Sequence, residues 1–515
     1  MKTLTAAVLL ALAVPAIAAP SAERRIAVDA ADAGTPRDRF ADLSVGSDYP
    51  GTLIRDDSLS QLKTARDELG FRYIRFHAIF HDVLGTYKEV DGKPVYDWSK
   101  IDYLYDRLLK MGIKPFVELG FTPLAMRSSD LSIFYWKGNT SHPDPKKWAA
   151  LVDAFVRHVQ ERYGKEEVRS WFFEVWNEPN LDGFWEKADQ KAYFELFDIT
   201  SRAIKAIDPA LRVGGPSTAG AAWVPEFLAH VKSSGAVADF ITTHTYGVDG
   251  GFLDENGKDD TKLSPSPEAI VGDVRKVRRE MAEAGHPEMP LYFTEWSTSY
   301  TPRDPVHDSY ISAPYILSKL KATEGIAQGM SYWTYSDLFE EPGPPTAPFE
   351  GGFGLMNPQG IRKPAWFAYK YLNQLGDTAL KTGDVQSYAA RDGQGVQVLA
   401  WDFQTPKQGR SNRGFYTTVQ PTRDSQPVNI DLKGLKPGAY SVQVYRTGFE
   451  ANDAHTAYLK MGSPKTLTPR QLERLQALTT DRPQTSTVRV PASGAASVKV
   501  KMRVNDVVLI KISPQ

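Results

Sequence analysis

The sequence WFFEVWNEPN, from Trp171 to Asn180, decides the fold. Its first half is apolar apart from one carboxylate, Glu174, a composition typical of a strand that is buried on both faces of a parallel sheet. Pro179 cannot take part in a hydrogen-bonded ladder, so the strand should end before it. We therefore expect Glu178 at the carboxyl end of a buried strand.

A second stretch repeats this arrangement. LYFTEWS, from Leu291 to Ser297, follows Pro290 and predicts another short aromatic strand with Glu295 at its end. The two glutamates are far apart in the chain, so only the fold can bring them together.

Short apolar strands alternate with amphipathic helical patterns over residues 36–376. The helical patterns space their apolar residues by three and four. Eight such units indicate an α/β fold, a closed (β/α)8 TIM barrel, and no glycine-rich dinucleotide fingerprint follows the first strand to favour an open doubly wound sheet. The expected strands cover residues 40–44, 73–77, 114–119, 170–175, 212–214, 240–244, 291–294 and 330–335. The expected helices cover residues 58–69, 98–110, 145–163, 191–207, 222–231, 267–284, 309–323 and 364–375.

The sequence pattern changes at about residue 377. From there to residue 515, stretches that alternate with period two are separated by turns rich in Gly, Pro, Asn and Asp. This pattern predicts a C-terminal β-sandwich domain after the barrel. A short stretch before the barrel, residues 25–28, could add an edge strand to that domain.

Composition and charge are those of an ordinary globular protein. The 515 residues are 42% hydrophobic, and 61 basic residues against 62 acidic ones leave a net charge of −1. This balance gives no reason to expect a nucleic-acid partner or a polybasic membrane-binding surface. The chain contains no cysteine, so it has no disulfide framework.

The first 19 residues have the pattern of a secretory signal peptide. Lys2 precedes an apolar run over residues 4–14, and small residues close the segment at Ala16 and Ala18. The apolar run is too short to span a bilayer, and no later stretch approaches about 20 apolar residues, so no retained membrane anchor is expected. We expect an exported protein, periplasmic or secreted, of bacterial type.

The positions of the two glutamates suggest a pair of catalytic carboxyl groups. In this fold catalytic groups stand at the carboxyl ends of strands, and Glu178 and Glu295 do so on strands four and seven. Two carboxyl groups about 5 to 5.5 Å apart are typical of retaining glycosidases, whereas roughly 6.5 to 9.5 Å is typical of inverting ones. The sequence does not give this distance, so both mechanisms stay open.

Several motifs together resemble glycoside hydrolase family 39, within the retaining (β/α)8 glycosidases. They are WNEPN with LDGFW after it, FHAIFHD at residues 76–82, TEWS at 294–297 and YWTYSD at 332–337. The resemblance extends over nearly the whole chain beyond the signal peptide. Its β-xylosidase branch is the most similar, through FVELGFTP at 116–123, WKGN at 136–139 and SDLFEEP at 336–342. One departure is Glu350, where histidine is expected, and it affects the shape of the entrance rather than the reaction.

The resemblance implies that Glu178 is the general acid/base and Glu295 the nucleophile. Glu178 must then carry a proton near neutral pH, so a hydrophobic wall and the second carboxylate should raise its pKa. Glu295 should stay ionised through the hydrogen bonds that it accepts.

Two polar residues near the strand ends are candidates for binding a sugar. Asn177 precedes Glu178 and has an amide that can hydrogen-bond a sugar 2-hydroxyl. His77 ends the second strand and could donate to another hydroxyl. His77, His81 and Asp82 could instead hold a metal, but the helical pattern of zinc proteases is missing, so neither a metal nor a cofactor is expected.

The remaining candidates follow strands six and eight. His244 and Tyr246 end strand six, where Tyr246 could donate its hydroxyl to the nucleophile. Trp333 on strand eight offers a flat apolar platform for a sugar ring. At least one of Glu340 and Glu341, in the next loop, is expected to accept hydrogen bonds from the sugar. Packing or solvated positions are the alternative for each of these residues.

The leading hypothesis is a retaining, exo-acting β-xylosidase that releases xylose from xylo-oligosaccharides. The alternative from the same family is an α-L-iduronidase-like or exopolysaccharide-cleaving enzyme, but the loop 337–350 has no Arg or Lys for a uronic acid carboxylate. A binding protein without activity should have lost one of the two acids, and a metal-dependent hydrolase would need a histidine pair at ligand spacing. The loop 246–264, rich in Gly and Asp, could shape the entrance or mediate association, and the oligomeric state is left open.

Overall fold

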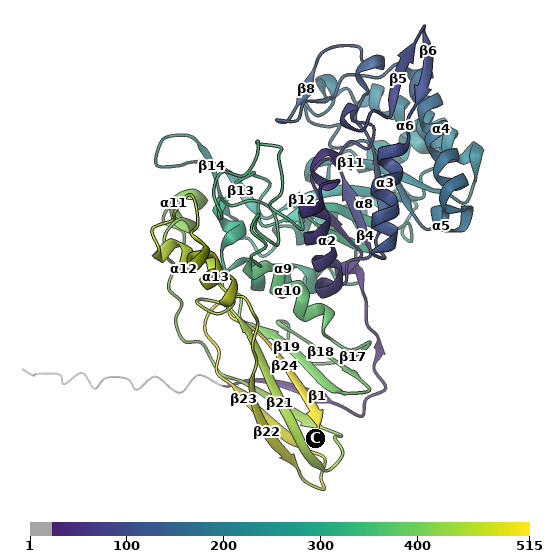
Figure 1. Ribbon diagram of the computed structural model, residues 1–515. Coiled ribbons are helices and arrows are strands. Elements are labelled where there is room, and N and C mark those ends of the chain that lie inside the picture. The colour runs from purple at the N-terminus through teal and green to yellow at the C-terminus, as the bar shows by residue number, and fades with distance from the viewer. Residues whose placement is uncertain (1–22) are drawn as a thin grey trace, which may run out of the picture.

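The computed structural model describes residues 23–515 (Figure 1). The predicted signal peptide, residues 1–19, lies outside the described residues. Figure 1 shows a barrel surrounded by helices and, below it, a sheet-rich domain that contains the C-terminus. None of the helices in residues 23–515 is long and apolar enough to cross a membrane.

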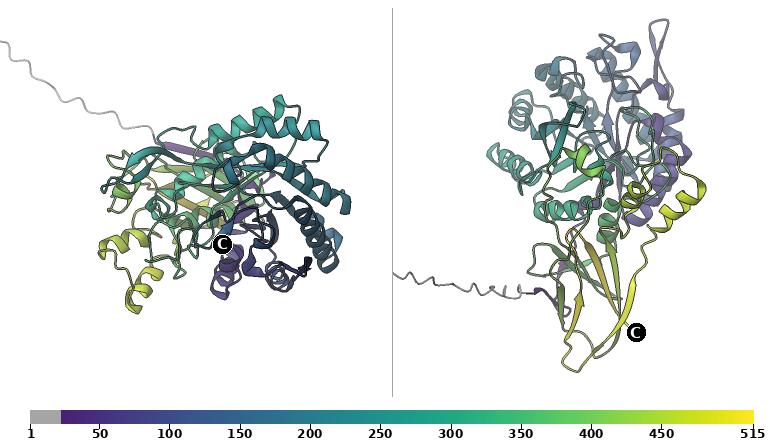
Figure 2. Two further views of the ribbon diagram at one scale, coloured as in Figure 1. Left: turned by 90° about the horizontal axis from the view of Figure 1, so that it is seen from above. Right: turned by 90° about the vertical axis from the view of Figure 1, so that its left-hand side faces the viewer.

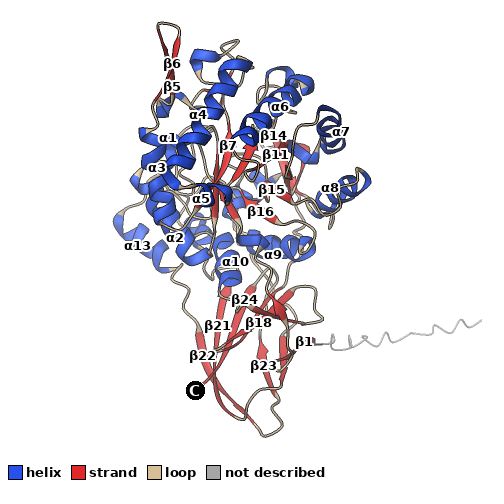
Figure 3. Cartoon of the chain, turned by 90° about the vertical axis from the view of Figure 1, so that its right-hand side faces the viewer, coloured by secondary structure: helices blue, strands red, loops and turns tan. Residues whose placement is uncertain are grey.

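Within the described range, eight parallel strands close a barrel, which confirms the predicted (β/α)8 fold. A helix follows each strand, and Figure 3 shows the blue helices outside the red barrel strands. The barrel strands are β3 (Ser44–Gly46), β4 (Tyr73–Phe76), β7 (Lys114–Leu119), β10 (Phe172–Val175), β11 (Arg212–Thr218), β12 (Phe240–Tyr246), β15 (Leu291–Ser297) and β16 (Gly329–Tyr332). The helices that follow them are α2 (Asp56–Leu69), α3 (Ser99–Lys110), α4 (Pro145–Tyr163), α6 (Gln190–Ile207), α7 (Val224–Ser234), α8 (Val271–Glu283), α9 (Ser312–Thr323) and α10 (Pro364–Asn373).

The first and last barrel strands differ from the prediction. The segment predicted as a strand at residues 40–44 begins with a 3-10 turn, η1 (Phe40–Asp42), because the Asp38 carboxylate accepts the Phe40 N–H and bends the chain. The strand β3 starts only after this turn. At the other end of the barrel, β16 stops before Trp333, so this residue lies just past the strand in which it was predicted.

The barrel interior has an aromatic floor beneath a layer of charged side chains. Residues i and i+2 of a strand face the same side, and here the charges stand two positions after the aromatic residues. The floor is formed by Tyr73, Phe116, Phe172, Phe240 and Tyr292, with Leu43 beside them. Above it lie Arg75, Glu118 and Glu174, all fully buried. Arg75 Nε lies 2.5 Å from Glu174 Oε2, and this pairing is what makes charged groups tolerable in a core.

A β-bulge in β15 turns Glu295 into the barrel mouth. The register with β12 shifts so that His244 pairs with Glu295 and Thr294 is the extra residue. Thr294 Oγ1 donates to Glu174 at 2.7 Å, and Glu295 accepts from Arg75 at 2.6 Å, so both face the interior. Without the bulge, alternation along the strand would turn one of them outward.

Two sheets form the C-terminal domain and share one core, as in a β-sandwich. The larger has the strand order β2-β17-β18-β19-β24-β21-β22 and the smaller β1-β20-β23. The strand expected at residues 25–28 lies within β1, which pairs with β20; Figure 2 shows this purple strand beside the green and yellow ones. The strands are β1 (Arg24–Asp29), β2 (Thr35–Pro36), β17 (Thr378–Leu380), β18 (Ser387–Asp392), β19 (Gly395–Trp401), β20 (Val428–Lys433), β21 (Gly438–Thr447), β22 (Gln484–Val490), β23 (Ala496–Val500) and β24 (Val507–Pro514). The domain also contains α11 (Asn412–Tyr416), α12 (Ala454–Lys460) and α13 (Pro469–Ala477).

The loops at the barrel mouth carry short elements of their own. The stretch 246–264, expected as a loop, forms a hairpin of β13 (Val248–Leu253) and β14 (Asp259–Leu263). Two further hairpins are β5 (Tyr87–Val90) with β6 (Lys93–Tyr96) and β8 (Ser132–Ile133) with β9 (Gly138–Asn139). The remaining short helices are α1 (Pro50–Leu53), α5 (Lys165–Arg169) and the 3-10 turns η2 (Asp82–Leu84), η3 (Leu124–Met126), η4 (Glu186–Ala188), η5 (Ala219–Ala221) and η6 (Pro305–Asp308).

Candidate active site

Glu178 is held by an unusual backbone path after β10. Trp176 and Glu178 both have left-handed φ angles, +71° and +46°, which non-glycine residues adopt only when the surroundings enforce it. The Glu178 N–H donates to the Ser217 carbonyl at 2.8 Å, so the next barrel strand fixes this conformation. The residue as a whole is 9% exposed, and its side chain points into the barrel mouth.

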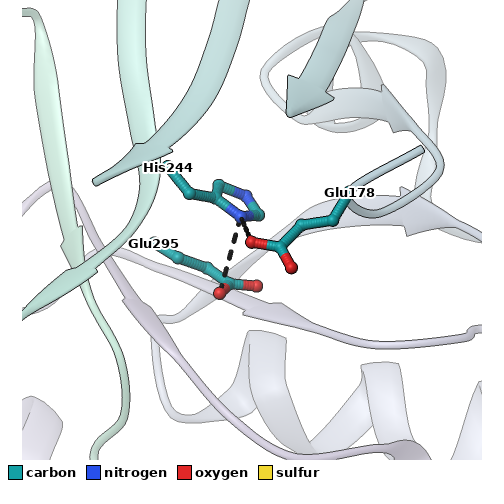
Figure 4. A group of neighbouring side chains, drawn as sticks. All are labelled: Glu178, His244 and Glu295. Atoms are coloured by element: carbon teal, nitrogen blue, oxygen red, sulfur yellow. Dashed lines mark hydrogen bonds and ion pairs between the residues drawn. The ribbon is translucent and has the colours of Figure 1, made fainter. Parts of the chain in front are cut away.

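The structure brings Glu178 and Glu295 together around His244 (Figure 4). His244 Nδ1 lies 2.8 Å from Glu178 Oε1 and 3.5 Å from Glu295 Oε2. One oxygen of each carboxyl group lies within 4.8 Å of the other. This spacing fits the retaining arrangement of about 5 to 5.5 Å better than the inverting one of roughly 6.5 to 9.5 Å.

Both oxygens of Glu295 accept a strong hydrogen bond. Arg75 Nη1 donates to Oε1 at 2.6 Å, and the Tyr246 hydroxyl donates to Oε2 at 2.7 Å. Donors of this kind favour the ionised carboxylate. Burial, followed by the charge of Glu295, raises the pKa of Tyr246 well above its usual value, so Tyr246 remains a donor.

Glu178 has the opposite environment. Burial raises the pKa of Glu178 to about 7, although the nearby cations His77 and Arg75 pull it down. Burial also lowers the pKa of His244 to about 4, so His244 is neutral beside the two acids. A carboxyl group with a pKa raised to about 7 therefore stands opposite a carboxyl group that accepts hydrogen bonds from Arg75 and Tyr246.

Arg75 connects the site to the charged layer below and was not predicted as a site residue. Burial alone would lower the pKa of Arg75, but the carboxylates of Glu174, Glu118 and Glu295 outweigh that effect and raise it. Arg75 Nη2 also donates to Asn177 Oδ1 at 2.9 Å. An arginine within an otherwise apolar strand is the signal that could have found it, because charged residues are rarely buried unless they are paired.

Asn177 is oriented by this contact. Its side-chain oxygen accepts from Arg75, so the amide NH₂ is the part of the group that can donate to a bound molecule. Asn177 is 1% exposed and directly precedes Glu178. The predicted donor to a sugar hydroxyl is thus placed beside the raised-pKa carboxyl group.

His77 lies between two carboxyl groups. Its Nδ1 lies 2.7 Å from Glu118 Oε2, and its Nε2 lies 3.1 Å from Glu341 Oε1. Burial opposes a charge on the ring, but Glu118 and then Glu341 raise the pKa of His77 well above 6.5, so it is an imidazolium. Glu118 was not predicted; like Arg75, it is a charged residue in a buried strand.

Glu340 and Glu341 separate clearly in the structure. Glu341 faces His77, and burial raises the pKa of Glu341 to about 8. Glu340 instead turns outward and forms an ion pair with Arg55 at 2.9 Å. Of the two candidates, only Glu341 has its carboxyl group in the cluster around the site.

Trp333, predicted as a platform for a sugar ring, lies next to the site and is 2% exposed. Its ring contacts His77, with centroids 4.7 Å apart, and packs with Phe339 and Phe353. A Cβ at Gly46 would lie 2.2 Å from the Trp333 ring, so only glycine at that position leaves room for it. Tyr246 packs against the same cluster, which places an apolar wall next to the carboxyl pair.

Glu178, His244 and Glu295 are also close enough to hold a metal ion. However, Arg75 and Tyr246 already donate to the two oxygens of Glu295. These donors would compete with a cation for the same oxygens, so the environment favours proton chemistry over metal binding.

Glu350, the departure from the expected histidine, holds the loop after β16. It accepts from the Thr346 N–H and hydroxyl and lies 3.2 Å from Arg303 Nε. Arg303 in turn donates to the Gly343 and Pro344 carbonyls. Glu350 thus shapes the entrance and does not reach the carboxyl pair.

Known proteins match this chain over almost all of the residues that the structure describes. The family described as "Glycosyl hydrolases family 39" matches residues 24–497. A β-xylosidase of Geobacillus stearothermophilus is 36% identical over 479 residues, 91% of this chain and 91% of that protein. The crystal structure of a monomeric β-xylosidase from Caulobacter crescentus CB15 is 67% identical with a TM-score of 0.94, over 95% of this chain and 99% of that one. Human α-L-iduronidase is 29% identical over 216 residues, only 40% of this chain and 31% of that protein.

Proposed function

Because the chain belongs to glycosyl hydrolase family 39, we propose that it is a retaining, exo-acting β-xylosidase that releases xylose from xylo-oligosaccharides. The observation that carries the proposal is the carboxyl pair: two acids within 4.8 Å, one with a pKa raised to about 7 and one bound by two donors that favour the ionised state. These are the two states that a double displacement requires at its start.

The first step forms a covalent glycosyl-enzyme. Glu295 attacks the anomeric carbon while the bond from that carbon to the leaving oxygen breaks, and Glu178 gives its proton to that oxygen. In the second step Glu178, now a carboxylate, takes a proton from water, and the water oxygen displaces Glu295. Each displacement inverts the anomeric carbon, so the product keeps the β configuration of the substrate.

Substrate recognition falls to the residues around the pair. The Asn177 amide would donate to the 2-hydroxyl of the terminal sugar, and Trp333 would face the ring. Glu341 and His77 would bind hydroxyl groups on the far side, and His244 would orient Glu178. Tyr246 and Arg75 would hold Glu295 in position and ionised.

A uronide substrate is less well supported by the residues at the entrance. The loop 337–350 contains no Arg or Lys. The two arginines that reach it are already paired, Arg55 with Glu340 and Arg303 with Glu350. A substrate carboxylate would therefore meet acids rather than the free cation that it needs.

Hydrolysis of a panel of aryl glycosides tests the proposal. We expect turnover of aryl β-xyloside, no turnover of aryl α-L-iduronide, and no effect of a chelator. Proton NMR during the first turnovers should show β-xylose before mutarotation produces the α anomer. α-Xylose as the first product would exclude the retaining mechanism, and turnover of the iduronide alone would exclude the xylosidase.

Glu341→Ala and Glu340→Ala form a matched pair that tests the sugar-binding role of Glu341. Loss of one partner of a hydrogen bond in a buried site leaves the other partner unpaired and lowers affinity roughly 10- to 100-fold, so Glu341→Ala should lower kcat/KM for aryl β-xyloside by that factor. Glu340→Ala removes only the ion pair with Arg55 and should cost much less. Steady-state kinetics of both variants decide the matter; equal losses would contradict the assignment.

Export is the last part of the proposal. The signal-peptide pattern over residues 1–19 would direct the chain out of the cytoplasm and be removed near Ala19. Residues 36–376 would then form the catalytic unit and residues 377–515 the accessory domain of the exported enzyme.

A further inference from the structure

A short helix of the C-terminal domain reaches the barrel mouth. It is α11, which lies in the long connection between β19 and β20, and Figure 1 shows it beside β13 and β14. We propose that its first residue, Asn412, is a positioning residue through which the C-terminal domain fixes the loops that follow the strands of Tyr246 and Glu295.

Asn412 is completely buried, and its amide makes four hydrogen bonds. The oxygen accepts from the Leu263 N–H at 2.9 Å and from Gln408 Nε2 at 2.8 Å. The nitrogen donates to Thr261 Oγ1 at 3.2 Å and to Asp304 Oδ2 at 2.8 Å. An amide group offers two donors and two acceptor sites, so this one is fully used.

Two of these partners belong to the hairpin that continues from Tyr246. Thr261 and Leu263 lie on β14, the returning strand. The hairpin is closed at its base by the Ser264 N–H, which donates to the Gly247 carbonyl, and Gly247 donates in turn to Ser297. Gly247 directly follows the tyrosine that binds Glu295, so a displacement of β14 is transmitted to that hydroxyl.

The third barrel partner, Asp304, lies in the segment after β15. Its other oxygen accepts the Val306 N–H and so caps η6. In η6, His307 Nε2 lies 3.1 Å from the Ser299 carbonyl, just past the end of the strand that carries Glu295. One side chain of the C-terminal domain thus connects the loops after barrel strands six and seven.

A second contact supports the same connection. The Arg413 N–H, next along α11, donates to Asp260 Oδ2 on β14 at 2.9 Å. The alternative is that these bonds only attach one domain to the other. The two interpretations differ in whether loosening the bonds changes the chemistry at Glu295 as well as the stability.

The test swaps the side chains of Asn412 and Asp304. In Asn412→Asp a carboxylate faces Asp304, and in Asp304→Asn two amides face each other. In the double variant Asp304→Asn/Asn412→Asp, a donor and an acceptor face each other again, and the remaining partners of position 412 can all donate to a carboxylate. Gln408→Ala is the control, because it removes the one partner that lies within the same domain.

Two measurements are made on each variant in the full-length protein. Hydrogen exchange of the Gly247 and Ser264 amides reports the hairpin and needs no substrate. The rate of inactivation by an activated 2-fluoro glycoside, of whichever sugar the substrate panel identifies, reports attack by Glu295. We expect Asn412→Asp to speed exchange at least tenfold and to slow inactivation about tenfold, with the double variant restoring both and Gln408→Ala changing neither.

The outcomes separate this inference from the proposed function, on which it rests only for the choice of sugar. Faster exchange with an unchanged inactivation rate would show that Asn412 merely attaches the domain. Unchanged exchange would show that no coupling to the hairpin exists. If the wild type does not turn over xyloside, the proposed xylosidase activity is wrong, but the role of Asn412 can still be tested. Hydrogen exchange needs no substrate, and the 2-fluoro glycoside can be chosen to match the sugar that the enzyme does accept.

Discussion

Glu295→Ala should lower kcat for aryl β-xyloside by ~10⁴-fold or more, because it removes the nucleophile of the first displacement. The substitution leaves space at the position from which the carboxylate attacks. Azide is small enough to enter that space and to attack the anomeric carbon from the same face. We expect azide to restore turnover, with α-xylosyl azide as the product, because only one displacement then occurs.

The configuration of the azide product shows whether Glu295 is the nucleophile or only part of a structural network. Arg75 and Tyr246 already bind the Glu295 carboxylate, so loss of activity alone could reflect disruption of that network. An inverted azide product shows in addition that the substrate still binds and that the missing group was the nucleophile. Glu195→Ala, on the outer surface of α6, makes the same chemical change away from the site and should keep wild-type turnover. A Glu295→Ala variant that remained active without azide would disprove the assignment.

The barrel and the positions of Glu178 and Glu295 near strand ends were predictable because their signals are local. Pro179 predicts that the apolar strand ends before it, so Glu178 should follow that strand, and the eight alternating units indicate a closed sheet. The features that set the geometry are not local. Thr294 and Glu295 face the same side only because β15 contains a bulge. A bulge is defined by the pairing of two strands, so the sequence of β15 alone does not reveal it.

The electrostatic support of the site was predicted only in part. Tyr246 was expected to donate to the nucleophile, and it does so at 2.7 Å. Arg75 and Glu118 were missed because the partners that make their burial possible come from other strands. Glu340 and Glu341 are neighbours in sequence, so only the direction of each side chain separates them.

Glu178→Ala has the second large effect that we expect, and its size depends on the leaving group. A general acid contributes roughly 10²- to 10⁴-fold when the leaving oxygen needs a proton. Cleavage of xylobiose or of an aryl xyloside with a basic leaving group should fall by about that factor. Cleavage of a dinitrophenyl xyloside, whose leaving group departs as an anion, should lose far less in its first step.

The pH dependence provides the second half of this prediction. Burial raises the pKa of Glu178 to about 7, and the acid acts only while it carries its proton. For a basic leaving group, kcat/KM of the wild type should therefore fall as the pH rises through about 7, since kcat/KM reports groups of the free enzyme. Glu178→Ala should lack this basic limb. With azide added, the variant should form β-xylosyl azide, because Glu295 still performs the first displacement. A basic limb that persists in the variant would assign the proton to another group, of which Glu341 is the nearest candidate, because burial raises its pKa to about 8.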